Sequence, residues 1–140
     1  MLSIAGADRD AIVGHCRAEL PNEACGILGG TAGRVESVHP VRNVLASPVR
    51  FAMDPLEQLS ALEAIGRDGR GVVGIYHSHP GGPAAMSEID LAEARWPGTA
   101  EPSYPGAVQV IVSLRDSLAP VLRGYAPSAG RFVEVPVVIV

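Results

Sequence analysis

An α/β fold made of one domain is predicted by three features of the 140-residue sequence. Apolar runs bounded by glycine or proline indicate buried strands, and other segments carry the start signals and apolar spacing of helices. Residues 49–76 follow the order strand, helix, strand, which lets the helix cover one face of a sheet. A chain of this length buries a sufficient core without disulfides, so residues 1–140 are expected to form one unit.

The first part of the chain predicts a helix followed by a hairpin. The helix is expected from about Asp8 to Glu19, since apolar residues recur at intervals of four: Ile12, Cys16 and Leu20. Pro21 and Asn22 end it. A strand over residues 23–30 and a return strand over residues 34–39 then flank a turn at Thr31-Ala32-Gly33.

The middle of the chain predicts the strand–helix–strand passage. Val49–Met53 is expected to be a short strand. Asp54-Pro55-Leu56-Glu57 places an acid at the N-cap, proline at the first helical position and glutamate at the third, which predicts a helix that runs to Arg67. Gly71–Tyr76 is then a glycine-bounded apolar strand.

The last part predicts one more helix and three strands. Ser87 is a natural N-cap for a helix from Glu88 to Arg95, and the loop Pro97–Pro105 is expected to line or cover a groove. Strands are expected at Ala107–Leu114, Pro120–Tyr125 and Phe132–Val140, with Pro136 indicating a sheet edge or a bulge. The tail Val137–Val140 is suited to burial either in the sheet or in a dimer.

Composition excludes several classes of partner and location. The net charge is −4, lysine is absent and the arginines are dispersed, so nucleic acid is not expected as a partner. No segment has the length of a membrane span, and Asp8, Arg9 and Asp10 interrupt any signal-peptide pattern. Two cysteines are too few for a disulfide framework. A cytoplasmic protein is the expectation.

A metal site is predicted where the Gly71–Tyr76 strand ends. His77 and His79 lie two residues apart and therefore point to the same side of an extended strand. Asp90 would be the third residue of the following helix, and so lies in its first turn. Two imidazole nitrogens and one carboxylate oxygen are a ligand set of catalytic zinc that leaves a fourth position for water. Taken singly, each residue has an ordinary structural explanation; the combined spacing favours the metal.

Two further residues are candidates for the same cleft. Glu23 begins a strand that is otherwise apolar, and beside a metal its carboxylate could take a proton from water and pass it to a leaving amine. The alternative is a solvated residue at the start of a strand. Cys25 has the same alternation phase as Glu23, so it either approaches the floor of the cleft or is buried.

These residues together resemble a known family. Glu23, His77-Ser78-His79-Pro80, Ser87 and Asp90 match the signature of the JAMM (MPN+, Mov34/PAD-1) zinc metallopeptidases. Residues 21–30 and 43–55 are similar to its compact bacterial branch. The resemblance covers nearly the whole chain and implies a single JAMM domain with a cytidine-deaminase-like fold, a curved mixed β-sheet with helices on both faces.

The resemblance also implies the role of each site residue. Zn²⁺ would be held by His77, His79 and Asp90, with Glu23 as the general acid and base. Ser87 would donate a hydrogen bond to the oxyanion that forms during cleavage. The Glu23 strand and the loop after Pro80 would flank a groove for an extended C-terminal tail.

The implied substrate is a small ubiquitin-like sulfur-carrier protein with a C-terminal Gly-Gly. Relatives of this size resemble hydrolases that release cysteine, or another amino acid, from such carriers in cysteine biosynthesis. Other readings are an inactive MPN scaffold, a hydrolase of small amide conjugates, and a cysteine hydrolase that uses Cys25. The short loops argue against a deubiquitinase. Oligomeric state and any movement of the loop Pro97–Pro105 are left open by the sequence.

Overall fold

One eight-stranded mixed sheet organises the computed structural model, which describes residues 1–140. The strand order is β7-β6-β5-β4-β2-β3-β1-β8. Three neighbouring pairs are parallel (β4–β5, β1–β3 and β1–β8), and the other four are antiparallel. The strands are β1 (Leu2–Ile4), β2 (Cys25–Thr31), β3 (Arg34–Val41), β4 (Gly71–His79), β5 (Val108–Ser113), β6 (Val121–Ser128), β7 (Arg131–Val135) and β8 (Val137–Ile139).

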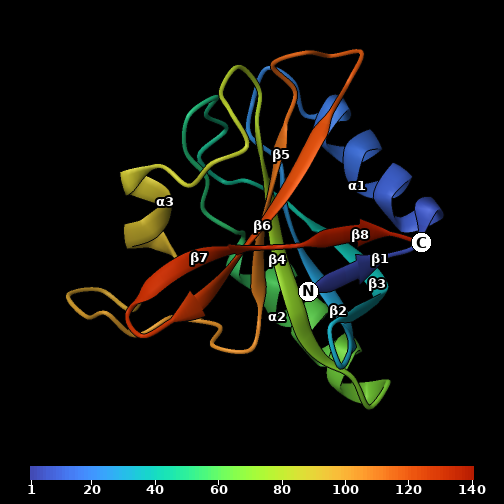
Figure 1. Ribbon diagram of the computed structural model, residues 1–140, viewed down its shortest axis with the longest axis vertical. Coiled ribbons are helices and arrows are strands. Elements are labelled where there is room, and N and C mark those ends of the chain that lie inside the picture. The colour runs from blue at the N-terminus through green and yellow to red at the C-terminus, as the bar shows by residue number, and fades with distance from the viewer.

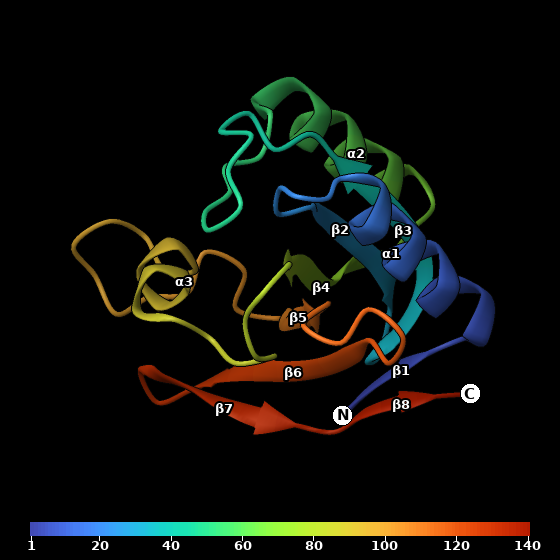
Figure 2. The ribbon, with the colours of Figure 1, turned by 90° about the horizontal axis from the view of Figure 1, so that it is seen from above.

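The sheet is strongly curved, because its two outermost strands follow one another in the chain. Only Pro136 separates β7 from β8, although these strands stand at opposite ends of the strand order. In Figure 2 they run one after the other along the same side of the molecule, next to β6. Gly124 of β6 approaches Val137 of β8 so closely that a side chain at Gly124 would touch it.

Helices cover both faces of the sheet, as the sequence predicts. Side chains of α1 (Gly6–Ala18) pack with one set of strand residues, which includes Leu28 and Tyr76. Side chains of α2 (Pro55–Arg67) pack with the alternate set, which includes Ile27 and Ile75. Since successive residues of a strand point to opposite faces, the two helices lie on opposite sides. The short helix α3 (Glu88–Glu93) stands on the side of the molecule away from α1 (Figure 1).

The capping signals locate two helix starts correctly. The side chain of Asp54 accepts a hydrogen bond from the backbone N–H of Glu57, with Pro55 at the first position of α2. Ser87 caps α3, and Asp90 is its third residue. The predicted strands at residues 71–76 and 107–114 are found as β4 and β5, although β4 extends through His79.

Other boundaries differ from expectation. Helix α1 begins at Gly6 rather than Asp8, after an N-cap residue, Ala5, that makes no side-chain cap. Helix α3 ends at Glu93 rather than Arg95. The predicted strand Val49–Met53 is wrong: the segment is irregular and makes one isolated bridge, between Asn43 and Met53.

The chain ends pair with each other, which the sequence pattern does not indicate. Strand β1 has only three residues and was not predicted, and the expected strand Phe132–Val140 divides at Pro136. The N–H of Leu2 donates to the carbonyl of Pro136 over 2.9 Å. The tail therefore pairs in the sheet as edge strand β8, but it is not buried there, since Val138, Ile139 and Val140 are exposed. Helices long and apolar enough to cross a membrane are absent from the structure.

Gly26 and Gly14 test how tightly the core is packed. A side chain on Gly26 would overlap the ring of Tyr76, which is fully buried with its hydroxyl held by His15. Gly14, in α1, has open space around it. We expect Gly26→Ala to lower the free energy of unfolding by about 1–3 kcal/mol through overpacking. Gly14→Ala should raise it by about 0.5–1 kcal/mol through helix propensity. Denaturant titration of both variants measures this; equal effects would contradict it.

Candidate metal centre

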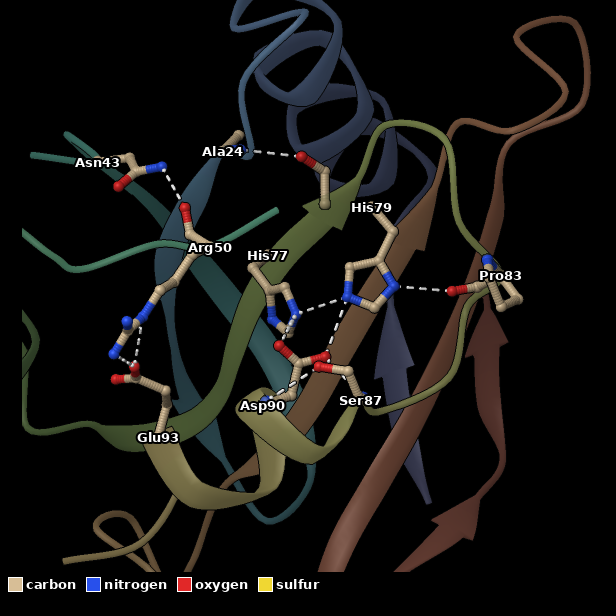
Figure 3. Close-up of polar contacts among 10 residues, drawn as sticks. Ala24, Asn43, Arg50, His77, His79, Pro83, Ser87, Asp90 and Glu93 are labelled. Atoms are coloured by element: carbon tan, nitrogen blue, oxygen red, sulfur yellow. Dashed lines mark hydrogen bonds and ion pairs between the residues drawn. The ribbon is translucent and has the colours of Figure 1, made fainter. Parts of the chain in front are cut away.

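Three ligand side chains converge where β4 meets α3. His77 and His79 end β4 on one face, and their Nε2 atoms lie 3.2 Å apart. Asp90 lies against both, with Oδ1 3.2 Å from His77 Nε2 and Oδ2 3.0 Å from His79 Nε2 (Figure 3). One donor atom from each residue falls within 4.8 Å of the other two. The structure thus brings together the three residues that the sequence predicts as metal ligands.

Asp90 is oriented by the cap of its own helix. The Ser87 hydroxyl accepts from the Asp90 N–H at 3.1 Å, and the Ser87 N–H donates to Asp90 Oδ2 at 2.9 Å. This reciprocal pair is a capping box. It fixes the carboxylate toward the strand end, where Asp90 is 7 % exposed.

Each imidazole is held by a different neighbour. His79 Nδ1 is 2.7 Å from the carbonyl of Pro83, which fixes the donor on that nitrogen and leaves Nε2 free to face Asp90. The ring of Phe51 stacks on His77 with centroids 4.7 Å apart. His77 Nδ1 is buried without a hydrogen-bond partner. The Phe51 contact is a feature of the site that the sequence pattern alone did not indicate.

The electrostatics of the cluster suit a cation. Burial favours neutral Asp90, but its hydrogen bonds with His77 and His79 outweigh that effect and hold its pKa far below the usual range. Burial lowers the pKa of His77. For His79 burial acts in the same direction, but the bonds to Asp90 and Pro83 prevail and raise its pKa. Asp90 therefore stays ionised in the cluster and needs a positive partner. A metal ion bound by the three side chains can be that partner.

The donor spacing also fits one ion. Ligands bound at 2.0–2.1 Å to a tetrahedral metal lie about 3.3 Å from one another. Here the two Nε2 atoms lie 3.2 Å apart, and each lies 3.0–3.2 Å from one of the two Asp90 carboxylate oxygens, His77 from Oδ1 and His79 from Oδ2. One cation of that size could therefore be held by all three side chains.

Glu23 lies just before β2 and is almost entirely buried. Its side chain is 3 % exposed, and Oε1 has no hydrogen-bond partner. Burial raises the pKa of Glu23 to about 7, the positive His79 lowers it and the negative Asp90 raises it. Glu23 is therefore near enough to the cluster for the charges of two ligands to act on its carboxyl group, and it is not a solvated residue.

Cys25 belongs to the core and not to the cleft floor. It is fully buried among residues that pack under α2, and its thiol donates to the carbonyl of Val41 over 3.4 Å. Burial raises the pKa of Cys25 to about 12. A thiolate nucleophile would need a much lower pKa, so the alternative of a cysteine hydrolase fails here.

A pocket of about 520 Å³ opens beside the metal ligands. It extends from His77 and Asp90 between α2, α3 and the loop that contains Tyr104. Apolar side chains form most of its wall, and Gln109, 5 % exposed and without a side-chain hydrogen bond, lies on the strand beneath. Tyr104 belongs to the predicted groove-lining loop Pro97–Pro105. Glu93, which lines the pocket, accepts a hydrogen bond from Arg50 at 2.7 Å.

Comparisons with known proteins agree with this geometry. Residues 7–123 match the model of a family described as prokaryotic homologs of the JAB domain. A desampylase of Haloferax volcanii is 44 % identical over 104 residues, which are 69 % of this chain and 75 % of the relative. A CysO-cysteine peptidase of Mycobacterium tuberculosis is 36 % identical over 133 residues, 94 % of this chain and 86 % of the relative.

The fold agrees with a solved structure from the same group. A JAB1/MPN domain protein from Archaeoglobus fulgidus superposes with a TM-score of 0.58 at 18 % identity. The match covers 100 % of this chain and 97 % of that one. The predicted architecture, a mixed sheet with helices on both faces, is therefore confirmed.

Glu23→Gln tests how far burial of the carboxyl group destabilises the metal-free protein. The Glu23 carboxyl group has a pKa near 7 in the folded protein and 4.5 in the unfolded chain. Between these two pH values only the folded state keeps the proton, so the free energy of unfolding falls as pH rises from about 4.5 to 7. We expect the variant to equal wild type below pH 4.5. Above pH 7 it should exceed wild type by up to about 3 kcal/mol. Urea titrations with chelator at several pH values measure this; a gap that does not change with pH would contradict the assignment.

Proposed function

Because the chain belongs to the family of prokaryotic homologs of the JAB domain, we propose that it is a zinc-dependent peptidase of small ubiquitin-like sulfur-carrier proteins. It would cleave the peptide or isopeptide bond after the carrier's C-terminal Gly-Gly and release cysteine or another terminal residue. The observation that carries this proposal is the convergence of His77, His79 and Asp90 beside a buried Glu23. The names of the desampylase and CysO-cysteine peptidase relatives support it.

Zinc is the metal that this donor set suits best. Two imidazole nitrogens and one carboxylate oxygen, with one position open, form the usual arrangement of catalytic zinc. Zinc held by His77, His79 and Asp90 would polarise the scissile carbonyl and lower the pKa of water to about 7. We further propose that residues 1–140 act as one domain, which agrees with the continuous sheet.

Glu23 supplies the proton transfers of hydrolysis. As water adds to the carbonyl carbon, the Glu23 carboxylate takes one of its protons. It then gives that proton to the amine nitrogen as the C–N bond breaks, which leaves a carboxylate on the carrier and a free amine. A general base works best with a pKa near the operating pH, and burial raises that of Glu23 to about 7.

Ser87 is placed to assist the developing charge. Its oxygen already accepts the Asp90 N–H, so the hydroxyl proton remains available to a substrate oxygen. A donor of this kind to an oxyanion typically contributes about 3–4 kcal/mol to the transition state. Ser87 would thus combine two roles, orienting a metal ligand and donating to the scissile carbonyl oxygen.

The shape of the cleft suits a carrier tail that is thin at Gly-Gly and has a larger side chain at a residue before it. Glycine residues have no side chains, so Gly-Gly can lie against the sheet where the ligands crowd together. The same residues cannot fill the adjoining pocket of about 520 Å³. We propose that this pocket takes an apolar side chain of the carrier that precedes Gly-Gly.

The inactive-scaffold alternative is not favoured. A scaffold has no need of two buried ligands, a partly buried third and an unpaired buried carboxyl group, since each of them costs free energy to bury. Here all four residues are present, and the orientation of Asp90 and His79 is set by dedicated hydrogen bonds. The two relatives named above, a desampylase and a CysO-cysteine peptidase, are both named for an enzymatic activity.

Metal content tests the centre directly. Purified wild-type protein should hold about one zinc per chain, because three side chains share one ion. His77→Ala removes one ligand and should lose most of it, and Cys25→Ser, altered within the adjacent core, should keep it. Elemental analysis after gel filtration measures this. Full zinc content in His77→Ala would contradict the ligand assignment.

Turnover of a carrier tests the reaction and its substrate. A small ubiquitin-like protein ending in Gly-Gly-Cys should lose its terminal cysteine, seen by intact mass spectrometry, and a matched carrier ending in Ala-Ala-Cys should not. Glu23→Gln should retain zinc but lower the rate about 10²–10⁴-fold, since it cannot transfer the proton. Cys25→Ser should retain most of the rate. If the protein cleaved small amides but no carrier, the proposed carrier substrate would be wrong, whereas the proposal that the protein is a hydrolase would stand.

A further inference from the structure

Asn43 has the most connected side chain of the irregular segment between β3 and α2. Its Nδ2 donates to the carbonyl of Glu23 at 3.0 Å and to that of Arg50 at 3.1 Å. Its Oδ1 accepts from the N–H groups of Leu45 and Ala52, each at 3.1 Å. One amide thus satisfies four backbone groups, and one of them belongs to the residue that carries the buried carboxyl group.

The backbone around Glu23 is held from both sides. On one side, besides the Asn43 bond, its N–H donates to the carbonyl of Ser47 over 2.8 Å. On the other, the next N–H, of Ala24, donates to the Ser78 hydroxyl over 2.8 Å (Figure 3). The Ser78 N–H returns a bond to the Ala24 carbonyl. Glu23 itself makes no side-chain bond through Oε1, so its position depends on these backbone contacts.

The same segment forms a wall of the pocket. Asn43 binds the backbone of Arg50 and of Ala52, the residues on either side of Phe51. The ring of Phe51 stacks on His77. Phe51, Ala52 and Met53 line the pocket. Asn43 therefore joins the residue proposed to transfer protons to the wall against which the substrate would lie.

We propose that Asn43 is a positioning residue for Glu23: it fixes the backbone of the acid–base residue relative to the substrate wall and the metal ligands. This inference rests on the proposed role of Glu23 in hydrolysis. Asn43 itself touches neither the ligands nor the pocket, and acts through the backbone groups it binds.

The amide chemistry explains why asparagine occupies this position. An amide offers two donor hydrogens and an acceptor oxygen, and the site needs both kinds. Aspartate has the same shape and keeps the bonds from Leu45 and Ala52, but it cannot donate to the carbonyls of Glu23 and Arg50. Asn43→Asp therefore removes the link to Glu23 with little change in volume, and Asn43→Ala removes it without adding a charge.

Ser47→Ala is a matched control in the same segment. The Ser47 hydroxyl accepts from the N–H of Val49 at 3.2 Å, and it has no bond to Glu23. The bond from the Glu23 N–H goes to the Ser47 backbone carbonyl, which alanine retains. This control therefore loosens the segment and leaves the Glu23 links in place.

The experiment compares the three variants with wild type. Zinc content, kcat and KM are measured on the Gly-Gly-Cys carrier, and hydrogen exchange of the Glu23 amide is followed by NMR. Both Asn43 variants should keep their zinc and lose about 10–100-fold in kcat, with KM changed less than about threefold. The Glu23 amide should exchange faster in both. Ser47→Ala should match wild type in every measurement.

Other results overturn the inference. Retained kcat in folded, zinc-loaded Asn43 variants would show that Glu23 does not need this link, and loss of zinc would show that Asn43 supports the ligands instead. A rise in KM alone would assign it to substrate binding. If wild type cleaves no carrier, the proposed function fails, and unchanged exchange of the Glu23 amide in both variants would still separately refute the link.

Discussion

The site depends on one buried carboxylate placed between two imidazoles. Asp90 is removed from water, so its charge must be balanced by groups that reach it from another part of the chain. Its partners come from the end of β4, eleven and thirteen residues earlier, and a capping box turns the carboxylate toward them. The intervening loop is tied to strands β5 and β6 by Ser113, which donates to Gly82, and Tyr125, which donates to Ala84. Convergence of the ligands is therefore a result of the sheet and not of the loop alone.

Burial has a second effect at Glu23, where it favours the protonated form. Removing this carboxyl group from water costs free energy, and no hydrogen bond at Oε1 offsets that cost. It appears instead as a pKa near 7, which suits a group that must both accept and release a proton. Stability and chemistry therefore oppose each other at this residue, and backbone hydrogen bonds from two segments keep it in place.

Local signals in the sequence predict the ligand set well, because each ligand is specified within a few residues. The two-residue spacing of His77 and His79 and the cap at Ser87 are read from short windows, and the structure has both features. Strand β1 escapes prediction because three residues pair with the far end of the chain, and no local pattern records that. The strand expected at Val49–Met53 fails for a different reason. The Asn43 side chain takes the backbone groups of Arg50 and Ala52 that a strand would give to a neighbour.

The position of the groove follows from how the sheet is covered. Helix α2 packs over Ile27 and Ile75 but ends its coverage near β4, and Gln109 of β5 lies below the open pocket. The six-residue α3 and the segment around Tyr104 close only the far side of that opening. His77 stands on β4, at the border between the covered and the open part, with Cys25 as its cross-strand neighbour. Cys25 lies on the covered side and is inert, whereas His77 faces the opening. The chemistry of these two cross-strand neighbours thus depends on where the helix stops, because Cys25 packs in the core beneath α2 and His77 lines the pocket.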